Sequence, residues 1–173
     1  MKTGRKHRLR GQGAPVPGAD EGGVAAIEFG IVFMLFFAIL WGILTYGFIF
    51  AAQQTLTLAA ENGARAALRY QPAGTQAGAI AARVAAAQQD GENSVQWLRA
   101  FNANYYPANY VQATEQPCTY NGDLICFTVQ VSYPYAQAPL FPPFPGFGLV
   151  APQKLTGTAT MQMDPANLLV SAG

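Results

Sequence analysis

Two cysteines are the residues whose type and spacing most directly indicate chemistry. Cys118 and Cys126 bracket Asn121-Gly122-Asp123, a strong signal for the turn of a β-hairpin. In the simplest hairpin with a three-residue loop, Tyr120 lies opposite Leu124, and the two cysteines then oppose each other as well. Opposed residues have Cα atoms about 4.5 to 5.5 Å apart, within the range of a disulfide. The spacing therefore predicts a Cys118–Cys126 bridge, which an oxidising compartment permits.

A metal half-site is the alternative use of such a thiol pair. The sequence has no further cysteine, and its one histidine, His7, lies in the amino-terminal leader. The carboxylates after the apolar segment are scattered among predicted turns and strand ends and form no acid–base or nucleophilic constellation. The scattered carboxylates include Asp90, Glu92, Glu115, Asp123 and Asp164. We expect no metal, no cofactor, no small-molecule substrate and no enzymatic activity.

A single carboxylate, Glu28, interrupts an otherwise uncharged apolar run from Val24 to Ala52. The run has about 29 residues, roughly 43 Å as a helix, whereas about 20 residues cross a bilayer core. A charged carboxylate costs about 2.5 to 3.5 kcal/mol at the bilayer centre and less near its edge. The simplest reading of Glu28 alone is a tolerated interfacial acid in the first turns of the helix, where the helix dipole favours negative charge.

The charge distribution around the apolar run predicts its orientation. Half of the ten basic residues precede it within the first ten positions, at Lys2, Arg5, Lys6, Arg8 and Arg10. The positive-inside rule then keeps this end in the cytoplasm and exports the chain beyond about residue 53. Because a membrane segment follows the basic cluster and no aromatic residues are interleaved with it, we expect no nucleic-acid binding.

The chain after the apolar run predicts an α+β head. Helical periodicity and breakers indicate helices over about 53–70, 75–90 and 94–102, the second stopped by Asp90-Gly91. Alternating residues indicate strands over about 109–119, 124–135 and 154–163, arranged as a three-stranded antiparallel sheet. Aromatic residues in the proline-rich loop 138–152 either cover the sheet or meet a partner. The predicted organisation is a leader at 1–23, a transmembrane helix at 24–52 and a head at 53–173.

The order of basic leader, Gly-Gly, small residues, glutamate and apolar helix resembles the class III signal of type IV pilins and pseudopilins. The resemblance implies that a prepilin peptidase cuts between Gly23 and Val24, which leaves Glu28 at the fifth position of the mature chain. It also implies a role for Glu28 in assembly, with the freed Val24 amine of one subunit near the Glu28 of another. Val24 departs from the phenylalanine common in larger pilins.

The stretch "GVAAIEFGIVFMLFF" with the later "QQTLTLAAENGARAALRY" resembles the TadE-like family of pilus assembly proteins. "VQVSYPY", the proline-rich loop and "LTGTATMQMD" extend the resemblance over most of 23–164. It implies a minor pseudopilin of the tight-adherence (Tad/Flp) pilus machinery in the inner membrane, with an exported periplasmic head. Its implied partners are the prepilin peptidase, other pilins and pseudopilins, and Tad platform proteins. Two alternatives stay open: a type II secretion pseudopilin, and an uncleaved single-pass envelope protein with a binding head.

Overall fold

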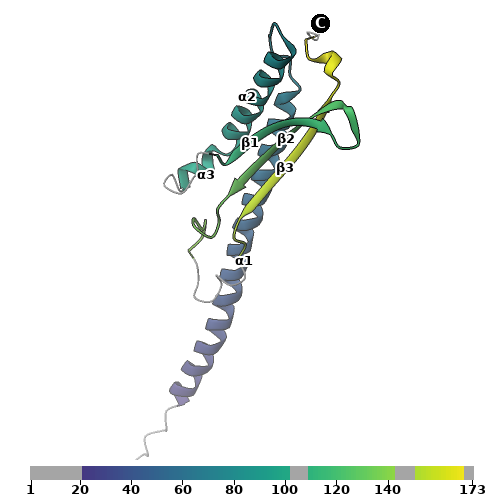
Figure 1. Ribbon diagram of the computed structural model, residues 1–173. Helices are drawn as coiled ribbons and strands as arrows, with labels where there is room; N and C mark the ends of the chain where they lie inside the picture. Colours follow the sequence, from purple (N-terminus) through teal and green to yellow (C-terminus); the bar gives the residue numbers. More distant parts are fainter. Residues whose placement is uncertain (1–20, 102–108, 143–150, 170–173) are drawn as a thin grey trace, which may run out of the picture. The chain divides into compact units, whose positions relative to one another are not determined.

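The computed structural model describes residues 21–101, 109–142 and 151–169 (Figure 1). The basic cluster at 2–10, His7, residues 102–108 and part of the proline-rich loop, 143–150, lie outside the described residues. Three helices, α1 (Glu21–Ala67), α2 (Gln76–Ser94) and α3 (Gln96–Phe101), precede three strands. The strands are β1 (Val111–Cys118), β2 (Asn121–Tyr133) and β3 (Leu155–Met163), followed by a short 3₁₀ turn, η3 (Pro165–Asn167). The predicted α+β class is confirmed.

The chain divides into two compact units between Leu40 and Trp41, and α1 contributes to both. In the first unit, the helix is built from apolar and small residues whose side chains face outward. Val24, Ile31, Met34 and Leu35 are among the most exposed. Such an exposed apolar helix surface is suited to contact with another apolar medium or chain.

The second unit combines the later part of α1 with α2 and a sheet in the order β1-β2-β3, in which both neighbouring pairs are antiparallel. The predicted alternation of β2 is confirmed: Phe127, Val129, Val131 and Tyr133 are buried. They join a single hydrophobic core with one face of α1, which includes Leu56, Ala60, Ala64 and Ala67. Gly63 on the same face is also buried, whereas Leu68 follows the end of α1 and is exposed.

Helix α2 extends past the stop predicted at Asp90-Gly91 and ends at Ser94. Thr75 is the N-cap residue of α2: its side-chain oxygen accepts a hydrogen bond from the Gly78 backbone N–H at 3.1 Å. Gly91 is buried within the helix, and a Cβ there would lie only 2.9 Å from a methyl group of Val111. The glycine thus permits close packing of α2 on β1 and does not end the helix, so the predicted stop is wrong.

The hairpin register also differs from the prediction. The turn lies at Thr119–Tyr120, Cys118 pairs with Asn121, and Cys126 lies opposite Gln116. The Asn121 side chain accepts a hydrogen bond from the Asp123 backbone N–H at 3.0 Å, and this local turn occupies the first residues of β2. The three residues 122–124 have no partner in β1, and the ladder resumes with Pro117 opposite Ile125. The predicted three-residue loop and the direct opposition of the cysteines are wrong.

Candidate functional site

Gly23, Val24 and Glu28, the residues of the predicted processing signal, lie in the first two turns of α1. All three are exposed, and a Cβ built on Gly23 would have no neighbour within 4 Å. Helical geometry separates Val24 from Glu28 by four residues, so their side chains lie on the same face of the helix. A single accessible strip thus presents the predicted cut site and the glutamate.

Helix α1 is the one helix in the described ranges that is long and apolar enough to cross a membrane. Glu28 is the one charged residue of α1 between Val24 and Ala52. Three phenylalanines follow at four-residue spacing: the ring centroids of Phe29 and Phe33 are 5.9 Å apart, and those of Phe33 and Phe37 are 6.2 Å apart. The candidate site is therefore an exposed apolar helix surface with one carboxylate near its beginning.

The predicted disulfide between Cys118 and Cys126 is present, with a Cα–Cα distance of 5.1 Å. The two residues are diagonal neighbours across the irregular end of the hairpin, since Cys126 pairs with Gln116. Both cysteines are buried. The bridge closes the hairpin at the point where the regular ladder is interrupted.

Arg83 is a structural residue that the sequence pattern did not predict. It lies in α2 between Ala79 and Ala87 at four-residue spacing, and only 1% of its surface is exposed. Its guanidinium donates hydrogen bonds to three backbone carbonyls: those of Ala67 at 2.9 Å, Arg69 at 2.6 Å and Leu168 at 3.3 Å. Burial lowers the pKa of Arg83 from its ordinary value. The sequence could have indicated this burial, because Arg83 lies on the same helix face as Ala79 and Ala87.

The hydrogen bonds of Arg83 connect segments that are distant in sequence. Ala67 is the last residue of α1, and its carbonyl carries the partial negative charge of a helix carboxyl end. Leu168 follows η3 near the end of the described chain. Arg83 therefore caps the carboxyl end of α1 and connects it to the segment after β3. Its role is to stabilise the fold.

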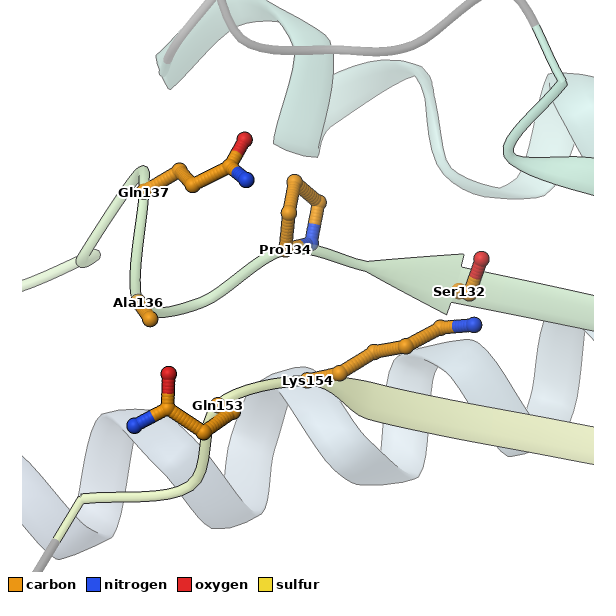
Figure 2. Close-up of a pocket in the computed structure, with 6 residues that line it drawn as sticks. All are labelled: Ser132, Pro134, Ala136, Gln137, Gln153 and Lys154. Carbon is orange, nitrogen blue, oxygen red and sulfur yellow. The ribbon is translucent and has the colours of Figure 1, made fainter.

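A polar hollow of about 390 Å³ lies where β2 ends and β3 begins. Figure 2 shows the Lys154 side chain extended toward Ser132, with Gln137 and Gln153 at the other end of the hollow. In the described ranges, no three His, Cys, Asp or Glu side chains are grouped so that they could hold a metal ion. The hollow can offer hydrogen bonds and one positive charge to a ligand.

These features define a class of protein: an α+β head that follows one candidate membrane-spanning helix with an acidic residue near its beginning. Residues 23–65 match the family model described as TadE-like protein. The match confirms the TadE-like resemblance over this segment and supports a protein associated with Tad pili. No curated protein and no solved structure shows significant similarity to the chain.

Proposed function

We propose that the protein is a minor pseudopilin of a tight-adherence (Tad/Flp-type) pilus machinery. In this proposal, residues 1–23 are a cytoplasmic leader, 24–52 span the inner membrane and 53–173 form a periplasmic head. The observation that carries the proposal is the position of Glu28, five residues after Gly23 on an exposed apolar helix. The TadE-like match supports it further, since the matched segment begins at residue 23, where the proposed leader ends.

Leader removal is a hydrolysis of the Gly23–Val24 peptide bond by the prepilin peptidase. Water adds its oxygen to the Gly23 carbonyl carbon as the C–N bond breaks, and both of its protons end on the Val24 nitrogen, so the products are a Gly23 carboxylate and a Val24 ammonium. The new Val24 amine is protonated at neutral pH, since an α-amino group has a pKa near 8. It offers an opposite charge to the Glu28 of a neighbouring subunit, and pairing inside the membrane offsets the cost of burying both.

The protein acts in this proposal by assembling with other pilins, pseudopilins and Tad platform proteins, without catalysing a reaction. A type II secretion pseudopilin is the second candidate, favoured by the same Gly23–Glu28 spacing, and the TadE-like match argues for the first. An uncleaved single-pass envelope protein with a binding head is the third. Cell adhesion and secretion would follow from the assembled pilus, not from a ligand-binding site on this chain.

The proposal is tested by amino-terminal sequencing of the protein extracted from membranes of cells with an active prepilin peptidase. The expected mature chain begins at Val24. Gly23→Val should leave the full-length precursor, because a branched side chain obstructs the peptidase at the cut site. Gly30→Val is the matched control, since Gly30 is also an open position in α1 and this variant should be cut normally. Native protein that retains its leader would refute the processing step.

A further inference from the structure

The chain after β2 turns back onto α1 through an aromatic cluster. The ring of Phe141 lies 4.7 Å from that of Trp41 and 5.5 Å from that of Phe48, measured between ring centroids. Trp41 and Phe48 are seven residues, about two turns, apart and so share one face of α1. All three residues belong to the second compact unit. The described part of the proline-rich loop thus covers a stretch of α1 that is apolar enough for a membrane.

A count of residues along α1 places this cluster at the edge of a bilayer. About 20 residues cross the hydrocarbon core, and 20 residues from Val24 end at Ile43. The apolar run continues to Ala52, so its last turns extend beyond the core into the headgroup region. Tryptophan and tyrosine are enriched at that depth because each combines an apolar ring with a polar group, and Trp41 is the member of the cluster of that type.

The turns of α1 at this level have two different faces. Thr45, Ile49 and Ala52 are buried by the head, whereas Ile43 is 64% exposed and Phe50 is 66% exposed. A helix segment covered by protein on one side and apolar on the other is suited to the boundary between lipid and head. The surplus length of the apolar run is then explained by this boundary and not by a longer span.

Polar side chains at the start of β3 belong to the same unit and lie further along α1 than the aromatic cluster. The Gln53 side chain donates a hydrogen bond to the Thr156 carbonyl at 2.7 Å, which holds the start of β3 at a point five residues beyond Phe48 on α1. Five helical residues rise about 7.5 Å. Lys154, two residues before Thr156, lines the polar hollow with Gln137 and Gln153 (Figure 2). It is the one lysine after Lys6 in the sequence.

We propose that Phe141, together with Trp41 and Phe48, inserts at the acyl–headgroup boundary of the bilayer, and that Lys154 contacts lipid phosphates. A lysine side chain is long enough to keep its stem along apolar surface while its ammonium reaches the headgroups. The occupant of this surface is lipid, because the cluster combines aromatic residues, a cation and the end of a span in the order found at membrane interfaces. The inference rests on the span of the proposed function and does not depend on leader cleavage.

The test uses the full chain reconstituted at low density in vesicles of phosphatidylcholine and phosphatidylglycerol, with or without brominated acyl chains. A single tryptophan is placed at residue 141 by combining Phe141→Trp with Trp41→Phe and Trp97→Phe. Bromolipids should quench its fluorescence by roughly twofold, as expected for an interfacial indole. The matched control carries Tyr120→Trp in the same background, since Tyr120 lies at the hairpin turn and is 68% exposed. Its fluorescence should be unchanged by bromolipid.

Equal, unquenched emission from both positions would overturn the proposal. If the variant at 141 does not fold, native Trp41 in the Trp97→Phe protein serves as the probe. Bromolipid should then quench the fluorescence of Trp41, and emission that is unchanged by bromolipid would contradict the proposed insertion.

The headgroup contact has a separate measurement. Lys154→Gln should reduce the quenching at residue 141 in vesicles that contain phosphatidylglycerol, and the loss should be smaller in phosphatidylcholine alone. Arg65→Gln is the control, because Arg65 is an exposed cation in the same unit that already pairs with Glu61. Equal quenching in the Lys154 variant and the parent would overturn the phosphate contact. Amino-terminal sequencing of the same samples reports the processing step independently.

Discussion

Gly157 of β3 lies directly against the backbone of Leu56 in α1. A Cβ built on Gly157 would overlap the Leu56 carbonyl and the Thr57 nitrogen, so any side chain there must displace backbone. A sheet and a helix approach this closely only where one of them lacks a side chain. The contact lies within a few residues of the Gln53–Thr156 hydrogen bond, and together the two features hold β3 on α1.

Gly157→Ala should therefore lower the free energy of unfolding by about 1 to 3 kcal/mol or more, as expected for overpacking against a rigid neighbour. Gly122→Ala is the matched control in the same sheet, because a Cβ at Gly122 meets nothing within 4 Å. Thermal or denaturant unfolding in detergent micelles measures both. Equal stability of the two variants would show that β3 can move away from α1 at little cost.

Replacing Arg83 with methionine should destabilise the head by roughly 2 to 4 kcal/mol. The substitution preserves much of the apolar stem but leaves three backbone carbonyls without their donor, and unpaired buried polar groups are costly. Arg65→Met is the comparison, since its ion pair with Glu61 is a surface pair with side chains 59% and 41% exposed, and such pairs contribute less than about 1 kcal/mol. Chemical denaturation of both variants gives the difference, and similar losses would contradict the capping role.

Cys118 and Cys126 should resist alkylation unless the protein is first reduced. Replacing both with serine should lower stability by about 2 to 3 kcal/mol, the chain-entropy estimate for a loop this short. Mass spectrometry after alkylation without reductant determines whether the bridge exists in the cell. A protein that takes up two alkyl groups under those conditions would contain free thiols and would lack this support for the hairpin.

Tyr133 should make the stability of the head sensitive to alkaline pH. It is buried and donates a hydrogen bond to the Ala138 carbonyl at 2.6 Å. Desolvation, with a smaller contribution from Tyr135, raises the pKa of Tyr133 above its ordinary value of 10.0. The neutral phenol is therefore favoured in the fold, so its contribution is complete below pH 10 and is lost as the pH rises toward the folded-state pKa.

Tyr133→Phe should lower stability at neutral pH by about 1 to 2 kcal/mol, because the hydrogen bond to Ala138 is lost. It should also weaken the alkaline destabilisation. Unfolding measured between neutral pH and pH 11 or so in both proteins tests this linkage. Tyr120→Phe, at an exposed position, provides the baseline. Parallel pH profiles for Tyr133→Phe and the parent would show that Tyr133 does not cause the effect.

Glu28→Ala should be processed normally and yet fail to support piliation, because the proposed partner of Glu28 is the Val24 amine of another subunit. Immunoblots report the size of the mature chain, and electron microscopy counts the pili. Glu61→Ala is the control, since Glu61 forms an exposed pair with Arg65 within its own helix. Wild-type pilus numbers in the Glu28 variant would leave this residue as an interfacial acid at the first turns of α1.

The amino-acid sequence alone determined the features that depend on local composition and periodicity. The apolar run of α1 could be predicted from composition, and the buried alternation of Phe127 to Tyr133 from its repeat of two residues. The pairing of Cys118 with Cys126 could be predicted because the two cysteines bracket a turn signal, although the register assumed for that prediction is wrong. The Gly23–Glu28 spacing is likewise a property of the chain itself, and its functional use stays a prediction.

The tertiary structure decided the features that join segments distant in sequence. Asp90-Gly91 reads as a helix stop, but contact with Val111 places Gly91 inside α2. The local turn at Asn121 shifts the hairpin register, and the disulfide tolerates the shift because a diagonal cysteine pair is still within reach. Arg83 acquires its role only when α1 and the segment after β3 bring their carbonyls to it. Such contacts depend on packing between elements, which the periodicity of a single element does not encode.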